Sequence, residues 1–323
     1  MASYRWRTRA EDNGLGLAEA VSTYLGVPKE EAADLIDFGS VYVRGRIERN
    51  PSMVLAGEEE ISVTFASYGT RRSYQIDPAR IIFRDRFLLA YDKEAGIPSQ
   101  QVPYDAYNNV YAALLRRLEE ERTDFPCSQE QGEGSVSRES MDFLPASRRP
   151  GPLPAPIQVY AALHHRLDME TSGVLLFTLE RKVNESLGRA FRERRVMKEY
   201  LAWIEGVPKN DSWNSDSDIG KIRGKYTAVR KGEGKAAETL FRVLRREEGR
   251  AMVLASPLTG RTHQIRIHLA EAGHPVLGDR AYGARPDKRL YLHAWRLALK
   301  HPVSGKLLSV EAPVPVEMMS REQ

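Results

Sequence analysis

The sequence predicts an α+β protein that is divided into two domains. Strand-like apolar runs are mixed with short helical segments, without the regular strand–helix–strand series of an α/β sheet and without an internal repeat. The length of 323 residues favours two domains. A linker over residues 67–79, polar over most of its length, separates a small module over 14–66 from a larger second region.

The N-terminal module combines two short helices with strands. Residues 16–26 and 29–39 are predicted helices, and each ends in glycine, the usual residue just beyond a helix C-terminus. Residues 40–48 alternate like a strand with a turn at Gly45, and 59–65 form another strand. The module is therefore predicted to be α+β in its own right.

The second region carries more strands than helices. Residues 79–100 contain two strand-like runs, and 108–122 place apolar residues at helical spacing. Residues 122–156 hold six prolines and few aliphatic side chains, which indicates a flexible insertion. The pattern then predicts a buried strand over 173–180, a basic amphipathic helix over 182–196 and an apolar strand over 198–206. A mobile polar arm over 207–235 and a β-hairpin over 238–258 follow. The last predicted elements are a helix over 262–273, capped by Thr262, and two closing strands over 289–315.

Composition narrows the class of protein. No run of about 18 apolar residues is present, so we expect no membrane span. The first 14 residues lack the apolar core of a secretory signal. Cys127 is the single cysteine, which excludes an intrachain disulfide and fits a reducing compartment. We therefore expect a cytoplasmic protein, and a monomer.

The charge is unevenly distributed. The net charge is +4, but residues 1–66 hold seven Lys/Arg and eleven Asp/Glu, a net of −4. Residues 181–198 hold seven basic and two acidic residues, a net of +5. A local basic patch of this kind suits a polyanion such as nucleic acid. The alternative interpretation is an ordinary solvated helix face.

Residues 164–173, HHRLDMETSG, place the carboxylate of Asp168 beside Arg166 and two histidines. The histidine spacings do not match a zinc set, and neither a phosphate-binding glycine loop nor a G-x-S-x-G elbow is present. Asp168 and Glu170 are too close in sequence to flank one glycosidic bond. What remains is one carboxylate among cations, which would favour its ionised form and make it a candidate nucleophile. A plain surface ion pair is the alternative.

Three segments together resemble a known family. Residues 165–177, 198–206 and 258–283 (HRLDMETSGVLLF, KEYLAWIEG and LTGRTHQIRIHLAEAGHPVLGDRAYG) are similar to the three signature segments of RluA-type pseudouridine synthases, in the same order and at similar spacing. The resemblance extends over 80–316 and implies the family's mixed, mainly antiparallel sheet core. Residues 14–66 resemble the small RNA-binding domain that many members carry at the N-terminus.

The resemblance implies an enzyme that isomerises uridine in structured RNA to pseudouridine with no cofactor and no metal. Asp168 matches the catalytic aspartate, Tyr200 the aromatic residue that packs on the target base, and Arg266 the arginine that pairs with the aspartate. Arg166 matches the arginine that fills the gap left by the flipped nucleotide. The other predicted RNA contacts are His165, Thr171, Arg261, His263, Gln264, Arg189, Arg192, Arg194, Arg195 and Lys198.

Several alternatives stay open at this stage. The substrate is predicted to be large-subunit ribosomal RNA by analogy, with transfer RNA as the second choice. A non-catalytic RNA-binding or chaperone protein could keep the fold, and a base-excising glycosylase would release uracil. Two departures from the family pattern matter: Lys93–Glu94 stands where the family has Lys-Pro, and the N-terminal module is acidic.

Overall fold

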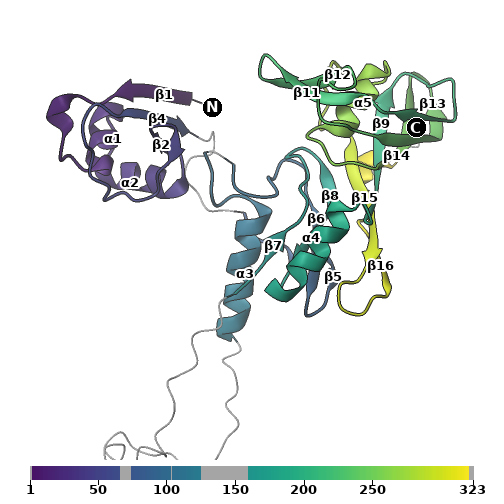
Figure 1. The fold of residues 1–323 in the computed structure, drawn as a ribbon, viewed down its shortest axis with the longest axis horizontal. Coiled ribbons are helices and arrows are strands. Elements are labelled where there is room, and N and C mark those ends of the chain that lie inside the picture. Colours follow the sequence, from purple (N-terminus) through teal and green to yellow (C-terminus); the bar gives the residue numbers. More distant parts are fainter. Residues whose placement is uncertain (1, 66–73, 103, 125–158, 320–323) are drawn as a thin grey trace, which may run out of the picture.

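The structure is a computed structural model of the chain and describes residues 2–65, 74–102, 104–124 and 159–319. The linker prediction and the 122–156 insertion fall largely outside these residues. Figure 1 shows the N-terminal module beside a larger domain built around one long sheet. The five α-helices among the described residues are α1 (Leu17–Leu25), α2 (Lys29–Phe38), α3 (Val110–Asp124), α4 (Asn184–Arg192) and α5 (Gln264–Glu271).

The N-terminal module packs α1 and α2 against a four-stranded sheet of order β1-β4-β2-β3. Its strands are β1 (Ala2–Arg7), β2 (Val41–Val43), β3 (Arg46–Ile47) and β4 (Glu60–Phe65). The helices end at Gly26 and Gly39, both with positive φ, as predicted. The predicted start of the module at residue 14 was too late, because β1 pairs antiparallel with β4 along its whole length.

The large domain is a ten-stranded sheet of order β10-β13-β14-β9-β15-β8-β6-β5, with β16 on β15 and β7 on β8. Every pairing is antiparallel except β8 with β15. The fold is therefore α+β with a mainly antiparallel core. Its ten strands are β5 (Ile81–Arg84), β6 (Leu88–Lys93), β7 (Ala162–Leu163), β8 (Ser172–Thr178), β9 (Met197–Glu205), β10 (Ser212–Ser215), β13 (Thr239–Glu247), β14 (Arg250–Pro257), β15 (Leu292–Lys300) and β16 (Leu307–Glu311). A separate two-stranded ribbon is formed by β11 (Asp218–Ile222) and β12 (Lys225–Val229).

The parallel junction of β8 and β15 divides the sheet into two halves. Only two residue pairs join the strands there, Ser172 with His293 and Gly173 with Ala294. A Cβ on Gly173 would lie 2.2 Å from the backbone oxygen of Ala294, so only glycine fits. The hydroxyl of Ser172 adds a hydrogen bond to His293 Nδ1 at 2.9 Å. The Ser-Gly pair of the HHRLDMETSG segment therefore closes the junction between the halves.

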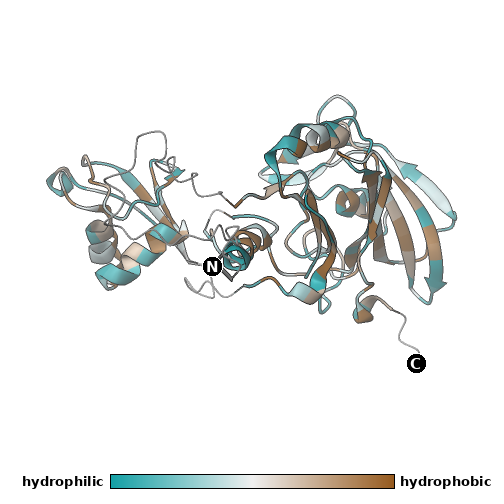
Figure 2. Ribbon diagram, turned by 90° about the horizontal axis from the view of Figure 1, so that it is seen from below, coloured by the Kyte–Doolittle hydropathy of each residue, from teal (hydrophilic) through white to brown (hydrophobic). Residues whose placement is uncertain are grey.

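Hydrophobic burial holds both halves of the sheet. All seven residues of β8 are buried, which confirms the predicted buried strand. Figure 2 shows hydrophobic residues concentrated on the strands and on the inner sides of the helices. One helix-to-sheet contact joins Leu187 of α4 to Leu176 and Leu297 in a shared cluster. None of the helices within the described residues is long and apolar enough to span a membrane.

Two local predictions were wrong. The predicted mobile arm over 207–235 contains β10 and an antiparallel ribbon of β11 and β12. The predicted helix after Thr262 forms as α5, but its N-cap is His263, which has a φ of +56° and makes no side-chain cap. Gly273 follows the helix with positive φ, as expected. His263 thus has a left-handed backbone conformation, which residues other than glycine adopt only rarely.

The N-terminal module contacts the large domain at the segment after residue 103. The amide of Ala106 donates to the carbonyl of Phe38 at 2.9 Å, and the Tyr107 hydroxyl donates to Asp37 at 2.8 Å. Ser40 Oγ donates to the carbonyl of Tyr104 at 3.1 Å. The C-terminal end of α2 and the residue before β2 are thereby hydrogen-bonded to residues 104–107. Residues 98–102, earlier in the chain, belong to the wall of the cavity described next.

Candidate functional site

A cavity of about 1130 Å³ opens where the two halves of the sheet meet. Its walls are residues 98–102, 163–171 and 257–266, together with parts of α4 and β9. Asp168, Tyr200 and Arg266 all line it, although they come from three distant segments. The three residues with predicted catalytic roles are therefore brought together.

The loop that carries Asp168 is tied down on both sides of the carboxylate. Thr171 N–H donates to the carbonyl of Asp168 at 3.1 Å and closes a turn. Ser99 Oγ donates to the carbonyl of Leu167 at 2.8 Å and accepts from its amide at 3.1 Å. The side chain of Asp168 consequently projects from a rigid loop into the cavity.

Lys93 supports the same loop and was not among the predicted site residues. Its fully buried Nζ donates to the carbonyls of Glu94, Ile97 and Met169 at 2.7–3.0 Å. Burial lowers the pKa of Lys93 to about 7, although the charges of Glu94 and Asp168 act against this shift. Lys93 matches the lysine of the family's Lys-Pro pattern, and this match was the available signal.

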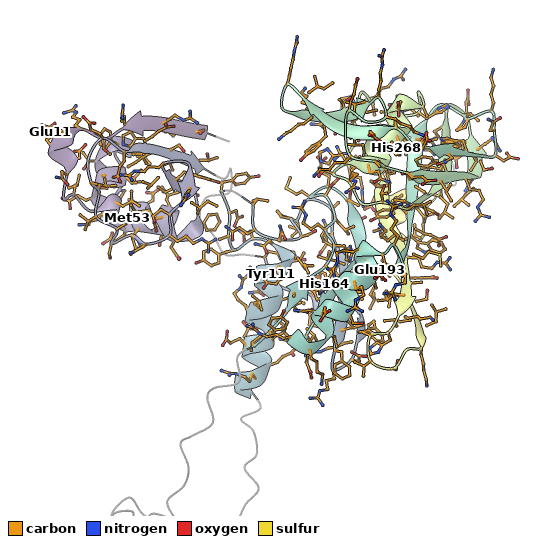
Figure 3. The ribbon with its side chains drawn as sticks, in the orientation of Figure 1. Glu11, Met53, Tyr111, His164, Glu193 and His268 are labelled. Atoms are coloured by element: carbon orange, nitrogen blue, oxygen red, sulfur yellow. The ribbon has the colours of Figure 1, made fainter. Side chains whose placement is uncertain are left out.

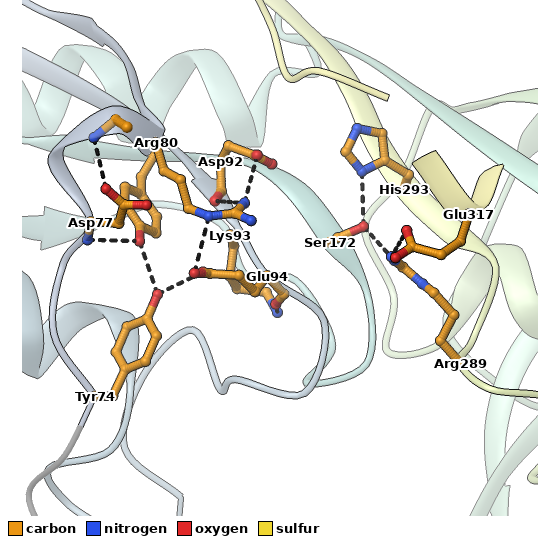
Figure 4. A network of polar contacts seen from close by, with 12 residues as sticks. Tyr74, Asp77, Arg80, Asp92, Lys93, Glu94, Ser172, Arg289, His293 and Glu317 are labelled. Atoms are coloured by element: carbon orange, nitrogen blue, oxygen red, sulfur yellow. Dashed lines mark hydrogen bonds and ion pairs between the residues drawn. The ribbon is translucent and has the colours of Figure 1, made fainter. Parts of the chain in front are cut away.

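Glu94, the residue that departs from the family pattern, has a defined role in the structure. Its carboxylate accepts from the Tyr74 hydroxyl at 2.7 Å and pairs with Arg80 Nε at 3.1 Å. Arg80 also donates to Asp92 at 2.8 Å (Figure 4). These contacts join the segment around Tyr74 and Arg80 to the C-terminal end of β6, where Lys93 supports the Asp168 loop.

Arg266 connects Asp168 to a fully buried partner. Its Nη1 donates to Asp168 Oδ2 at 3.3 Å, and its Nε and Nη2 donate to Asp279, each at 2.7 Å. Arg266 is only 4% exposed, so this bidentate pair orients the guanidinium in a low-dielectric setting. Asp279 lies in the GDRAYG part of the third signature segment and was also missed.

Tyr200 reaches the cavity from the middle of the sheet. On β9 it stands opposite Ala294 of β15 and Ala255 of β14. Burial, together with the nearby charge of Asp168, raises its pKa above the usual range, so the hydroxyl stays protonated near neutral pH. The partly buried ring presents an apolar surface beside the carboxylate.

His263 completes the polar rim around Asp168. Its Nε2 lies 3.9 Å from Asp168 Oδ2, and its Nδ1 shares a hydrogen bond with the Tyr282 hydroxyl at 2.8 Å. Burial lowers the pKa of His263 despite the attraction of Asp168. The ring therefore meets the cavity chiefly as a neutral hydrogen-bonding group at neutral pH.

Comparison with known proteins shows the family to which the chain with this cavity belongs. The family model described as RNA pseudouridylate synthase matches residues 154–271. Ribosomal large subunit pseudouridine synthase D of Nitrosomonas europaea is 32% identical over 278 residues, which cover 81% of this chain and 70% of that protein. Ribosomal large subunit pseudouridine synthase C of Yersinia pestis is 30% identical over 311 residues, which cover 90% and 85%. The chain belongs to the RNA pseudouridylate synthase family. It is therefore an isomerase.

Other matches agree in fold and are more limited in extent or identity. The Pasteurella multocida ribosomal large subunit pseudouridine synthase C is 38% identical over 176 residues, about half of each chain at 49% and 52%. The solved structure of Human RNA Pseudouridylate Synthase Domain Containing 1 is 25% identical with a TM-score of 0.51, covering 74% of the synthase and 86% of that chain. Human RNA Pseudouridylate Synthase Domain Containing 4, at 22% identity and a TM-score of 0.53, shares the fold.

Two of the predicted RNA contacts, His165 and Gln264, are hydrogen-bonded inside the protein, and the hydroxyl of a third, Thr171, is buried without a partner among the described residues. His165 Nε2 accepts from the amide of Leu176 at 2.9 Å, and burial lowers the pKa of His165 to about 3. Gln264 is buried, and its side chain bonds to Thr259, Glu238, Thr239 and the Arg261 amide. Thr171 is also buried. All three residues line the cavity, and their contact with RNA stays a prediction.

The predicted basic contacts divide into two groups. Arg166 is exposed, lines the cavity, and makes no hydrogen bond or ion pair with any described residue. The cavity is also lined by Arg192, Arg194, Lys198 and Arg261. By contrast, Arg189 and Arg195 lie outside the lining and pair with Glu185 and Glu193.

The histidines of the synthase are spread over the domain. In Figure 3, His268 lies on α5 in the upper part, whereas His164 lies beside α4 below. Among the residues that the structure describes, no group of three or more His, Cys, Asp and Glu side chains has the geometry of a metal site.

Proposed function

We propose that this synthase isomerises specific uridines in structured large-subunit ribosomal RNA, with Asp168 as the catalytic carboxylate. The observation that carries the proposal is the contact of Asp168 with Arg266 in a cavity that Tyr200 also lines. The bacterial relatives reported above are named as large-subunit synthases, which supports ribosomal RNA over transfer RNA as substrate. We further propose that the enzyme acts as a cytoplasmic monomer without a metal or cofactor.

The reaction requires one bond to break and another to form at the same sugar carbon. The bond from N1 of uracil to C1′ breaks, the base turns, and C5 joins C1′; C5 then loses a proton and N1 gains one. Asp168 would either attack C1′ or remove a proton from the sugar in an elimination route. Either step needs a carboxylate in a fixed position, which the tied loop and the Arg266 contact supply.

Access to the sugar requires that the nucleotide leaves the helical stack, which costs a few kcal/mol. Arg166, which lines the cavity and has no ion-pair partner among the described residues, suits the space left behind. The Tyr200 ring suits the face of the extruded base, and such stacking contributes about 1–3 kcal/mol. Arg192, Arg194 and Lys198 along the same wall suit the flanking phosphates.

The decisive experiment maps pseudouridine at nucleotide resolution in total RNA from cells with and without this gene. The deletion strain is complemented with the wild type or with Asp168→Asn. We expect one or a few large-subunit uridines to lose the modification and to regain it only with the wild type. A changed site in transfer RNA would redirect the substrate assignment, and an unchanged map would favour the non-catalytic RNA-binding alternative.

A further inference from the structure

The ribbon of β11 and β12 is a stiff projection at the rim of the cavity. Five antiparallel residue pairs join its strands, from Asp218 with Val229 to Ile222 with Lys225. The turn is the pair Arg223–Gly224, both with positive φ, which suits a tight hairpin. Figure 1 shows the ribbon protruding from the large domain at the end opposite the β15–β16 turn.

One face of the ribbon is anchored on the helix that carries Arg266. Ile219 is buried in a cluster with Ile267 of α5, and Ala228 and Tyr282 pack against it. Because side chains alternate between the faces of a strand, Lys221 and Tyr226 lie on this same face, two residues farther out. The anchored face therefore continues beyond α5 as an exposed surface.

That exposed surface adjoins the catalytic residues. The Tyr226 ring meets the His263 ring edge-on at 6.2 Å, and Tyr282 donates to the Tyr226 carbonyl at 3.2 Å. His263 in turn lies 3.9 Å from Asp168. Lys221 Nζ stands 5.4 Å from the centre of the Tyr226 ring. A polymer that leaves the cavity on this side meets Tyr226 and Lys221 at the same level, because the two residues are paired across the ribbon.

The ribbon region is basic and poorly neutralised. Residues 218–235 contain six Lys/Arg and two Asp/Glu, a net of +4. Lys231 is paired with Asp216, and Asp218 accepts from the amide of Gly232. Lys221 and Arg223 are exposed and have no carboxylate partner among the described residues. Cations left without partners beside an exposed aromatic ring suit a phosphate backbone with unstacked bases.

We propose that the anchored face and the turn of this ribbon bind the RNA backbone outside the catalytic cavity, through Lys221, Arg223 and Tyr226. This inference rests on the proposed function and names a substrate contact that the signature segments do not contain. A strand rises about 3.3 Å per residue, so the turn, two residues beyond the pair of Lys221 and Tyr226, lies about 7 Å farther out. The ribbon therefore contacts nucleotides next to the target and contributes affinity, while the reacting base is held elsewhere.

The test compares two charge-matched double variants of the full chain. Lys221→Gln with Arg223→Gln removes two ribbon cations; Lys209→Gln with Lys306→Gln removes two cations that lie outside the ribbon and the cavity lining. Each protein is titrated with an unmodified transcript of large-subunit ribosomal RNA over a range of salt concentrations. Single-turnover pseudouridine formation is measured at saturating enzyme.

We expect the ribbon variant to bind about tenfold more weakly, and the slope of log affinity against log salt to shrink by about 1.4–1.8 because two phosphate contacts are lost. The single-turnover rate at saturation stays within about twofold of the wild type. The control keeps the wild-type affinity and slope. Equal losses in both variants, or none in the ribbon variant, would overturn the proposal and leave an acidic protein as the ribbon's partner.

The proposed function is judged separately in the same assay. A wild-type protein that binds with the ribbon-dependent slope but forms no pseudouridine contradicts the catalytic assignment and leaves the ribbon contact standing. A wild-type protein that forms pseudouridine while the ribbon variant binds equally well contradicts only the ribbon contact.

Discussion

Asp279 accepts two hydrogen bonds from Arg266, both at 2.7 Å, and so determines where the third nitrogen of that guanidinium points. The free Nη1 is directed at Asp168, 3.3 Å away. Asp279 is fully buried and does not line the cavity. It acts as a positioning residue, because it contacts the proposed catalytic carboxylate only through Arg266.

Asp279→Ala should therefore destabilise the protein and disable the site together. The change leaves a buried arginine without its principal partner, which costs about 3–5 kcal/mol of unfolding free energy. Urea denaturation followed by circular dichroism measures this loss. Glu185→Ala, which breaks the exposed pair with Arg189, is the control and should cost less than about 1 kcal/mol. Similar losses in both variants would contradict the role of Asp279.

Asp168→Asn should abolish turnover while the fold is kept. The amide has the size of the carboxylate, and the loop is held by bonds to the backbone of Leu167 and Met169 that the change does not touch. We expect pseudouridine formation to fall by at least about a thousandfold, as for other catalytic nucleophiles. A tritium-release assay and a melting curve check the two parts. An unfolded Asn variant would contradict a purely catalytic role.

His165 should make stability depend on pH in the acidic range. Burial lowers its pKa from 6.5 to about 3, so between these values the unfolded chain binds a proton that the folded chain does not. The free energy of unfolding therefore falls as the pH drops below 6.5. Between pH 7.5 and 5, wild type should lose about 2 kcal/mol more than His165→Gln. Parallel pH profiles for the two proteins would refute this account.

Gln264→Ala should damage stability more than RNA binding. The buried amide joins Thr259 to the start of α5 and to the carbonyl of Glu238, and its loss removes the acceptor of the Thr259 hydroxyl and one of the donors to the Glu238 carbonyl. We expect a loss of about 1–3 kcal/mol on unfolding. At a temperature where the variant is folded, its RNA affinity should stay within about threefold of wild type. A tenfold weaker affinity with unchanged stability would instead support Gln264 as a direct RNA contact.

Removal of residues 1–66 should weaken RNA binding only slightly. The segment carries a net charge of −4, so it contributes little attraction to phosphates. Filter binding with large-subunit ribosomal RNA should give a loss below about threefold. Tyr107→Phe, which removes one docking bond to Asp37 but keeps the module, is the companion variant. A large loss on deletion would show that the local arginines of the module outweigh its net charge.

The order of most elements was predictable because their patterns are strong over short distances. The buried run of β8 and the alternation of β13 and β14 each contain a local signal. β1 was missed although Tyr4 and Trp6 alternate with charged residues, because its partner β4 is more than fifty residues away. The β11–β12 ribbon was missed because it buries only Asp218 and Ile219 and exposes its whole tip.

The residues of the candidate site were predictable as a group, and their individual tasks were not. Asp168, Tyr200 and Arg266 stand out through the signature segments. Nothing in those segments indicates that His165 accepts a backbone hydrogen bond, since the bond depends on where the amide of Leu176 lies. Lys93 and Asp279 were missed for the same reason, because a supporting contact is defined by distance in the folded chain.

The junction between β8 and β15 has a consequence for how activity arises. Asp168 precedes β8 in one half of the sheet, whereas Tyr200 and Arg266 belong to the other half. Neither half holds the complete set of proposed reacting groups, so under the proposed function pseudouridine formation reports that the halves have joined in register. Two fragments divided between β8 and β9 would each be inactive, and recovered turnover on mixing would measure their reassociation.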